Sequence, residues 1–254
     1  MTSEKVKKYW DQVASNKSLA KCLVTSPDIC LKVLEVELIK RFLSPNDKVL
    51  DLGCGNGWVS HKISDRVKSV IGVDFSVNMI TRALEEHKIY NTNFYLGNML
   101  KLDFKPICFD KVISVRSLQN LTSFEDQMIA ITEVYRVLKP GGIYIMIEGS
   151  KEGRDNINSL RESLKLEHIP NKPFNLHFNN SVLKSFLMIY FYKKEKISFG
   201  IYDLISKVVY PMTVFPAKPD YCNELNNIAS SLNYSITNKL FKFSRQIMYV
   251  LEKI

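Results

Sequence analysis

The stretch Val49-Leu50-Asp51-Leu52-Gly53-Cys54-Gly55-Asn56-Gly57 decides the fold class of this 254-residue chain. Its apolar first half is typical of a buried strand. Its three alternating glycines allow a sharp turn that approaches a ligand without interference from a Cβ atom. Because no Lys-Ser or Lys-Thr pair follows, the turn is not a phosphate-cradling P-loop. A second carboxylate, Asp74, stands 17 residues after Gly57, where an acid can accept hydrogen bonds from both hydroxyls of a ribose.

Short β-branched runs alternate with helical stretches on both sides of this turn. Strands are predicted at residues 48–52, 69–73, 93–96, 111–115 and 143–147, and helices at 27–42, 58–64, 76–87 and 124–138. This alternation is typical of βαβ units, in which a parallel sheet carries helices on both faces. Beyond residue 150 the pattern predicts helices at 154–166 and 181–190, strands at 196–202 and 242–252, and an insertion at about 203–240 that covers the active site.

The composition is that of an ordinary globular protein, with 46% hydrophobic and 24% charged residues. No apolar run approaches the roughly 18 residues of a membrane span, and no apolar stretch follows the N-terminal lysines, so we expect a cytoplasmic protein. Five scattered cysteines without a C-x-x-C pair argue against disulfides and a cysteine zinc site. No cluster with metal-ligand spacing is present, so no metal is expected.

The net charge of +9 is uneven, because residues 151–254 hold 15 basic but only 9 acidic residues. Such an excess attracts anions, including phosphorylated substrates or nucleic acid. A solvated lysine surface, which serves solubility, is the favoured interpretation of this charge.

Four pieces of the chain, in register over about residues 47–149, resemble the class I S-adenosylmethionine-dependent methyltransferases. They are Asp51 to Gly57, Gly72 to Ser76, Gly97 to Asp110 and Arg136 to Gly142. The resemblance implies an α/β fold: a Rossmann-like, doubly wound, mostly parallel seven-stranded sheet with an antiparallel edge strand. It also implies a single methyltransferase domain over residues 1–254, with a helical lid at 1–43, a cofactor-binding core at 44–150, and substrate-side elements that complete the sheet at 151–254.

The same resemblance places S-adenosyl-L-methionine in the glycine turn, with S-adenosyl-L-homocysteine as the product. Asp51 would lie near the methionine amino group and Asp74 at the ribose hydroxyls. Asn98 would meet the adenine amino group, where family members usually carry Asp, and an amide oxygen can also accept that hydrogen bond. The other implied contacts are Tyr9 and Trp10 of the lid, the backbone of Gly53, Cys54 and Gly55, the apolar Phe75, Met79 and Met99, and Arg116 with Ser117 near the methyl group.

Some of these residues also have purely structural interpretations. Phe75 and Met79 could equally be core residues. Tyr9 and Trp10 could close over the cofactor carboxylate or only attach the N-terminal segment to the rest of the chain.

Two acceptor chemistries stay open. An oxygen of high pKa needs a base, whereas an anionic acceptor needs positive or hydrogen-bonding groups that position it. The candidate catalytic residues are His177 in the long loop, Glu148 at the end of strand 143–147, and Arg116. Asn120 stands where a histidine is common in the family, which removes one frequent candidate base. Arg161 and Tyr202 are further candidates for holding an anion.

The sequence therefore predicts methyl transfer to a small polar acceptor, and favours an oxygen of a sugar hydroxyl, carboxylate or phosphoryl-type group. A similarity of Glu148 to Ser150, Asn175 to Phe178 and Val208 to Pro211 to small bacterial methyltransferases of surface-polysaccharide clusters indicates capsule or polysaccharide metabolism. The expected partner is a small molecule, anionic in one of the two chemistries, without membrane or nucleic acid, and the chain is expected to be a monomer or homodimer.

Two alternatives remain. The first is an RNA or protein methyltransferase, which the basic second half favours, although Val115-Arg116-Ser117-Leu118 replaces the Asn-Pro-Pro-Tyr-like signature of base amino methylation. The second is a non-catalytic partner protein with a cofactor fold.

Overall fold

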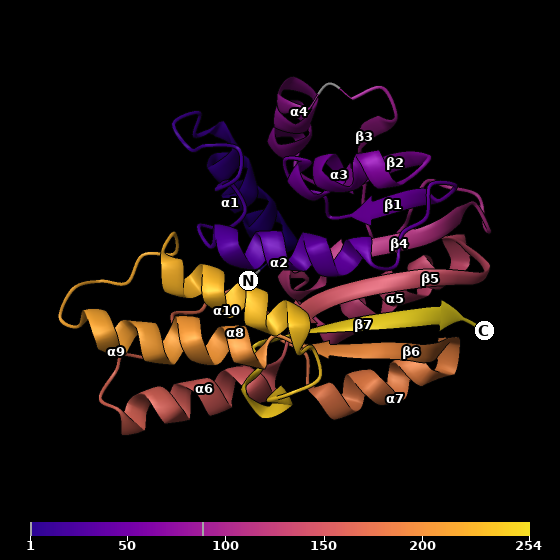
Figure 1. Cartoon of the computed structure of the whole chain (residues 1–254). Helices are drawn as coiled ribbons and strands as arrows, with labels where there is room; N and C mark the ends of the chain where they lie inside the picture. Colours follow the sequence, from indigo (N-terminus) through magenta and orange to yellow (C-terminus); the bar gives the residue numbers. More distant parts are fainter. Residues whose placement is uncertain (1, 88) are drawn as a thin grey trace.

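The computed structural model describes residues 2–87 and 89–254. Seven strands form one sheet in the order β3-β2-β1-β4-β5-β7-β6 (Figure 1). Their bounds are β1 Lys48–Leu52, β2 Ser69–Asp74, β3 Thr92–Leu96, β4 Phe109–Val115, β5 Leu138–Gly149, β6 Phe191–Ser198 and β7 Gln246–Lys253. Strands β1 to β5 pair in parallel, and β7 runs antiparallel between β5 and the edge strand β6. The predicted Rossmann-like sheet is confirmed, and its one antiparallel strand lies second from the edge.

The strand order reverses between β1 and β4, because the chain adds β2 and β3 on one side of β1 and then returns to the other. In open α/β sheets the ligand binds at such a point, beyond the carboxyl ends of the strands.

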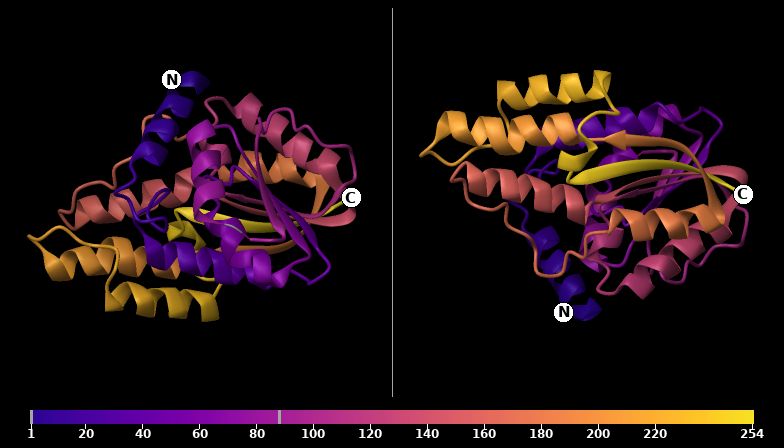
Figure 2. Two further views of the ribbon diagram at one scale, coloured as in Figure 1. Left: turned by 90° about the horizontal axis from the view of Figure 1, so that it is seen from above. Right: turned by 90° about the horizontal axis from the view of Figure 1, so that it is seen from below.

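Helices cover both faces of this sheet (Figure 2). Alternate residues of β1 point to opposite faces: Val49 joins a core with α2, α3, α8 and α10, whereas Leu50 and Leu52 join a core with α5 and α7. The helices are α1 Ser3–Ser15, α2 Ile29–Lys40, α3 Trp58–Ile63, α4 Val77–Glu86, α5 Phe124–Val137, α6 Lys151–Ser163, α7 Asn180–Tyr190, α8 Gly200–Leu204, α9 Tyr210–Val214 and α10 Glu224–Ser235. A π-helical turn at Ile205–Val209 joins α8 to α9, and short 3₁₀ turns lie at Ser64–Arg66, Leu118–Asn120 and Phe241–Phe243.

Helix α1 packs against α4, next to the end of β2. Asp11 of α1 accepts a hydrogen bond from the Ser76 hydroxyl, 2.5 Å away. The buried guanidinium of Arg82 on α4 donates to the carbonyl oxygens of Ala14, in the last turn of α1, and of Asn16, which follows the helix. The N-terminal helix is therefore held beside the carboxyl edge of the sheet.

Two strand predictions in the second half were displaced. The strand predicted at 196–202 occupies 191–198, because its lysines and Glu195 tolerate the solvated edge position that β6 takes. The backbone then turns into α8, where a Cβ atom at Gly200 would lie 2.1 Å from the Leu240 carbonyl oxygen. The last strand, predicted at 242–252, begins only at Gln246, after the 3₁₀ turn at Phe241–Phe243.

The prediction that the insertion at 203–240 covers the active site was wrong for most of its length. Helix α10 packs on α2, where the Ser230 hydroxyl donates to the Cys30 carbonyl oxygen and Asn227 contacts the Cys30 thiol. Lys207 pairs with Asp28, which caps α2. Within residues 2–87 and 89–254, no helix combines the length and the apolar character that a membrane crossing requires.

Candidate active site

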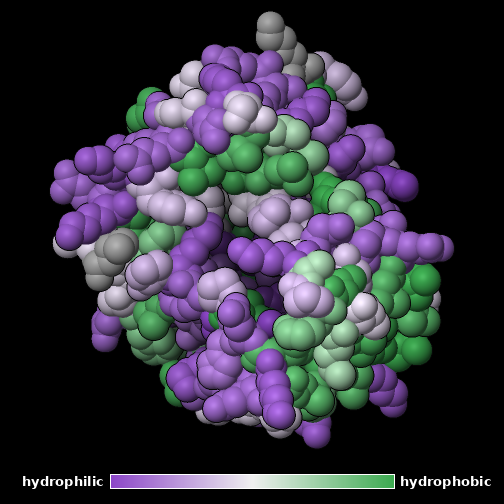
Figure 3. Space-filling view, turned by 90° about the vertical axis from the view of Figure 1, so that its left-hand side faces the viewer, coloured by the Kyte–Doolittle hydropathy of each residue, from purple (hydrophilic) through white to green (hydrophobic). Residues whose placement is uncertain are grey.

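A cavity of about 1030 Å³ opens where β1, β2, β4 and β5 end. Figure 3 faces this edge of the sheet and shows the hollow, bordered largely by hydrophilic residues with an apolar patch on one side. Every predicted cofactor contact except Tyr9 lines this cavity, and so do Arg116 and His177 of the predicted catalytic residues. Segments up to about 240 residues apart in the sequence, from Ser3 to Gln246, thus contribute to one site.

The glycine turn brings backbone close to the cavity. Gly53, Gly55 and Gly57 have φ angles of 74°, 54° and 76°, in the left-handed region that favours glycine. A Cβ atom at Gly53 would lie 2.4 Å from the Cβ of Ser117, so only glycine fits there. The N–H groups of Gly53 and Cys54 both donate to the Val73 carbonyl oxygen, at 2.8 and 3.0 Å. These two residues therefore offer a ligand close approach rather than free N–H donors.

Two buried carboxylates flank the turn. Asp74 accepts hydrogen bonds from the N–H groups of Gly55 and Ser76, each at 2.9 Å and each on a different oxygen, so each oxygen keeps a lone pair for a ligand. Asp51 accepts from the Ser60 hydroxyl at 2.6 Å. Burial raises the pKa of both carboxyl groups to about 6, which leaves both ionised at neutral pH.

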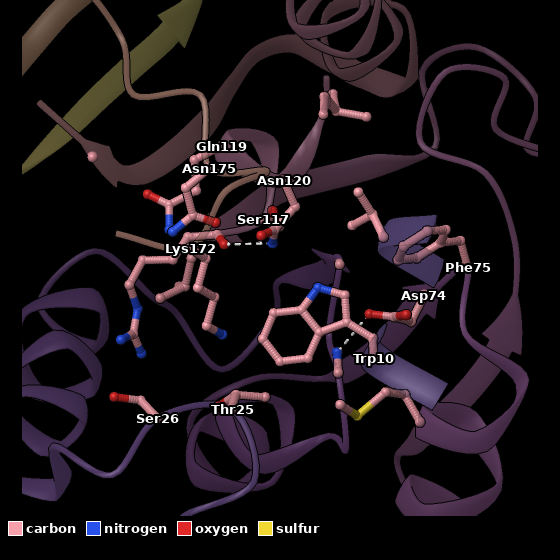
Figure 4. A pocket seen from close by; sticks show the side chains of 18 of the residues that line it. Trp10, Thr25, Ser26, Asp74, Phe75, Ser117, Gln119, Asn120, Lys172 and Asn175 are labelled. Atoms are coloured by element: carbon pink, nitrogen blue, oxygen red, sulfur yellow. Dashed lines mark hydrogen bonds between the residues drawn. The ribbon is translucent and has the colours of Figure 1, made fainter. Parts of the chain in front are cut away.

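Aromatic side chains of α1 meet the loop before α7. The Trp10 indole projects into the cavity near Asp74 and Lys172 (Figure 4). The Lys172 ammonium lies 4.0 Å from the centre of the Trp10 ring, and burial lowers the pKa of Lys172 to about 8. Tyr9 does not line the cavity but packs on Trp10 and Phe174, with ring centres 5.2 and 5.0 Å apart. The predicted contact of Tyr9 with the cofactor is thus replaced by a role in fastening α1 to the loop.

The remaining predicted cofactor residues lie around the same half of the cavity. Phe75, Met79, Asn98, Met99 and Ser117 all line it. Met79 serves the core as well, since it is 1% exposed and packs with Ala14 and Val24. Asn98 already accepts a hydrogen bond from the Leu100 N–H at 2.9 Å, on the amide oxygen predicted to face adenine.

Glu148 does not face the cavity, contrary to the prediction of a base or substrate contact. Its buried carboxylate accepts hydrogen bonds from the N–H groups of Ser117, Leu118 and Gln119, at 3.0, 2.9 and 3.1 Å. Burial raises the pKa of Glu148 to about 7. Glu148 therefore acts as a positioning residue for the turn that follows β4.

Arg116 lines the cavity from that same turn and has a φ angle of 54°. Its Nη2 lies 3.1 Å from a carboxylate oxygen of the buried Glu35. Burial raises the pKa of Glu35 to about 7 despite this ion pair. Glu35 therefore balances the Arg116 charge only in part at neutral pH, and the ion pair holds the guanidinium beside α2.

His177 lies at the other end of the cavity, close to Gly149. Its Nε2 is 3.1 Å from the Asn171 amide oxygen, and its buried Nδ1 has no partner among the described residues. Burial and the charges of Arg154 and Arg245 lower the pKa of His177 to about 4, so the ring is neutral at neutral pH. With Nε2–H donating to Asn171, Nδ1 presents a free lone pair.

The two further candidates for anion binding lie elsewhere. Arg161 donates to the carbonyl oxygens of Glu167 and Lys207 and does not line the cavity. The buried Tyr202 hydroxyl donates to Asp28, the residue that caps α2.

Several lining residues were not predicted from the sequence. They are Thr25, Lys32, Gln119, Asn120, Arg154, Lys172, Asn175, Tyr221 and Arg245. Gln119 and Asn120 carried a usable signal, because they lie in the turn after the end of a predicted strand. No group of three His, Cys, Asp or Glu side chains suited to a metal ion occurs in the part of the chain that the structure describes.

A family model described as a methyltransferase domain matches residues 43–198, more than half of the chain. The chain belongs to this methyltransferase family. The cofactor of the family is S-adenosyl-L-methionine, so the predictions of family, fold and cofactor are confirmed. The geometry fits this group, since the turn gives close backbone approach and Asp51 and Asp74 present ionised carboxylates into the cavity.

Curated relatives match part of the methyltransferase. A demethylmenaquinone methyltransferase of Lactococcus lactis is 39% identical over 108 residues, which cover 40% of this chain and 42% of the relative. A sterol 24-C-methyltransferase of Saccharomyces cerevisiae is 32% identical over 114 residues, which cover 43% and 29%. The chain thus spans about two fifths of the length of the first relatives that it matches.

Solved structures resemble the methyltransferase over most of its length. A Pyrococcus horikoshii OT3 protein has a TM-score of 0.60 at 22% identity and covers 89% of this chain and 92% of its own. A Haemonchus contortus phosphoethanolamine N-methyltransferase, in complex with phosphoethanolamine and S-adenosylhomocysteine, has a TM-score of 0.65 at 15% identity, over 100% of this chain and 50% of its own. At these identities the likeness shows the fold alone.

Proposed function

We propose that the chain transfers a methyl group from S-adenosyl-L-methionine to an oxygen of a small polar acceptor. One observation carries the proposal: a single cavity joins the glycine turn and its two carboxylates to a polar half lined by Gln119, Asn175 and His177. The first half suits the cofactor and the second suits an acceptor that makes hydrogen bonds. An apolar acceptor would leave the buried polar atoms of the second half without partners, at a cost in free energy.

The cofactor, when bound, supplies a methyl group that its own sulfonium activates, so the protein has to align the acceptor and exclude water. In the proposed site Asp74 binds the ribose hydroxyls, Asp51 the methionine amino group and Asn98 the adenine. Trp10 closes the cavity from α1. Arg116 and Ser117 border the region between the two halves.

His177 is the proposed catalytic contact to the acceptor, through the free lone pair on Nδ1. A base with a pKa of about 4 takes a proton poorly from an alcohol. His177 therefore orients a hydroxyl of the acceptor rather than deprotonating it. This favours the anionic member of the two acceptor chemistries.

The proposed acceptors are sugar hydroxyls, carboxylates and phosphoryl-type groups in capsule or polysaccharide metabolism, in the cytoplasm, with the enzyme as a monomer or homodimer. A cavity of about 1030 Å³ with one polar half supports a small molecule over an RNA or a membrane lipid. Demethylmenaquinone and sterols, the acceptors in the names of two relatives, differ from the acceptor proposed for this chain.

Labelled S-adenosyl-L-methionine tests the proposal on separated pools of small polar metabolites, RNA and protein. We expect label to pass only to the small polar pool, and we expect the labelled product to carry the methyl group on oxygen. Label in RNA or protein alone would favour the second enzyme class. Tight binding of S-adenosyl-L-homocysteine without transfer to any pool would favour a non-catalytic partner protein.

A further inference from the structure

Three segments meet at the end of β5 and bring Arg154, Arg245 and His177 together. The Ser150 N–H donates to the Arg245 carbonyl oxygen at 2.8 Å, and the Phe178 N–H donates to the Gly149 carbonyl oxygen at 2.9 Å. The first turn of α6, the residue before β7 and the loop before α7 are thus held together by backbone hydrogen bonds.

The backbone packing at this point is tight. A Cβ atom at Gly153 would lie 1.7 Å from the Ser244 carbonyl oxygen, so α6 lies directly on the segment that enters β7. A Cβ atom at Gly149 would lie 2.9 Å from His177 Nδ1. Arg154, Arg245 and His177 all line the cavity. Their positions are therefore fixed by the fold rather than by mobile surface loops.

The positive charge of this group is only partly balanced. Arg245 pairs with the buried Asp203, with Nε 2.8 Å from Oδ1. Arg154 gives one N–H to the Ile169 carbonyl oxygen and forms no ion pair with any described residue. The neighbouring Asp155 pairs instead with Lys151, at 2.8 Å. Burial lowers the pKa of Arg154, and the nearby positive charge of Arg245 lowers it further.

The carboxylates that line the cavity do not supply the missing charge. Asp51 in β1 and Asp74 at the end of β2 flank the glycine turn, and Glu4 and Asp126 come from α1 and from the start of α5. The two positive charges of Arg154 and Arg245 repel each other when no anion lies between them. The buried imidazole nitrogen without a partner adds a further cost in free energy. A guanidinium presents paired N–H donors that match the geometry of an oxyanion.

We propose that Arg154 and Arg245, next to His177, form a binding site for an oxyanion of the acceptor, a phosphate monoester or a carboxylate. This inference rests on the proposed function and deepens it, because it places the anionic group at the end of β5. The remainder of the acceptor extends through the same cavity toward Ser117 and the glycine turn.

Inorganic phosphate and acetate are the probes, added to protein saturated with S-adenosyl-L-homocysteine at constant ionic strength. Calorimetry measures their affinity, and the ring resonances of His177 measure its pKa. We expect phosphate, acetate or both to bind and to raise the pKa of His177, because a bound anion stabilises the imidazolium. The tighter of the two probes identifies the oxyanion. Binding of neither probe overturns the inference.

Arg154→Gln should lower the affinity for the probe about tenfold or more, since a charge-assisted contact to an oxyanion is lost. Arg161→Gln is the matched control: it removes one arginine from the same helix, outside the cavity, and should leave the affinity within about twofold. Equal probe affinity in wild type and Arg154→Gln would contradict the assignment.

A second variant guards against misfolding. Arg245→Gln alone would leave Asp203 buried and unpaired, so the double variant Arg245→Gln with Asp203→Asn is used. It should also lower the affinity for the probe. Affinity for S-adenosyl-L-homocysteine separates the two proposals. If it stays intact while neither probe binds, only the oxyanion site fails; if it is absent in the wild type, the proposed function fails.

Discussion

Replacing Asp74 by Asn perturbs the cofactor half of the cavity with the smallest change in shape. The carboxylate already accepts N–H bonds from Gly55 and Ser76, and the proposed function adds one ribose hydroxyl on each oxygen. Asn keeps one acceptor oxygen but places an NH₂ group where the second oxygen stood. One hydroxyl then loses its acceptor, and the other faces a neutral amide in place of an ion.

The expected loss follows from these contacts. A hydrogen bond to a charged group contributes about 1.5–3 kcal/mol, and the second contact is weakened as well, so the loss is about 3 kcal/mol. At about 1.4 kcal/mol per tenfold change, the Kd of S-adenosyl-L-homocysteine should rise about 100-fold.

The pH dependence gives an independent check. Burial raises the pKa of Asp74 to about 6 in the free protein, and the ionised form is the one that binds the ribose. Affinity should therefore be full at about pH 7.5 and fall as the pH drops through about 6, by up to tenfold per pH unit for each carboxylate involved. Asp51 has a similar pKa and contributes a second such dependence. Asp74→Asn should have a flatter profile than the wild type.

Calorimetry with S-adenosyl-L-homocysteine measures both effects. Because the raised pKa makes the charged form of Asp74 unfavourable in the folded state above about pH 6, removing that charge should leave Tm at about pH 7.5 close to the wild type. Asp110→Asn is the control: Asp110 bonds the Lys48 N–H at the other end of the sheet, outside the cavity. Unchanged affinity in Asp74→Asn, or a wild-type Kd that stays constant down to about pH 5, would refute the assigned role of Asp74.

Three further variants test separate parts of the site. Gly53→Ala should lower Tm and weaken S-adenosyl-L-homocysteine more than about tenfold, because its Cβ would lie 2.4 Å from that of Ser117 in a left-handed conformation; calorimetry that finds wild-type affinity would speak against the close approach. Glu148→Gln should lower Tm by about 2–8 °C, since at least one buried N–H loses its acceptor; a changed pH profile of turnover without a loss of Tm would instead restore the base role. Trp10→Ala should speed dissociation of S-adenosyl-L-homocysteine in stopped-flow measurements, whereas Tyr9→Phe should not; equal rates in both would remove Trp10 from the lid.

The cofactor half of the site was predictable because its residues follow strand ends that the sequence marks clearly. Gly53 and Gly55 directly follow β1, and Asp74 ends β2. In a parallel sheet the carboxyl ends of neighbouring strands meet at one edge, so correct strands suffice to bring these residues together. The correctly predicted strands therefore brought these residues to one cavity, while their contacts with the cofactor stay a prediction.

Neighbouring residues on a helix are a different case. Tyr9 and Trp10 lie about 100° apart around α1, so only one of them can face the cavity squarely. The sequence does not reveal which one, because both are large aromatic side chains. The prediction that Glu148 contacts the substrate failed for a related reason. Glu148 lies near the end of β5 as predicted, but its carboxylate accepts hydrogen bonds from the N–H groups of Ser117 to Gln119.

The arginines of the acceptor half were not predicted, because the predicted start of β7 was wrong. An antiparallel strand begins at the edge where parallel strands end, so the residues just before β7 lie beside the cavity. The predicted strand at 242–252 placed Arg245 inside the sheet. The observed strand begins at Gln246, so Arg245 precedes it and lines the cavity. A boundary error of four residues thus removed a cavity arginine from view. Arg154 was missed as well, because a charged residue in the first turn of a polar helix is common and does not by itself indicate a site. Only the position of Arg245 before β7 shows that the two arginines line the same cavity.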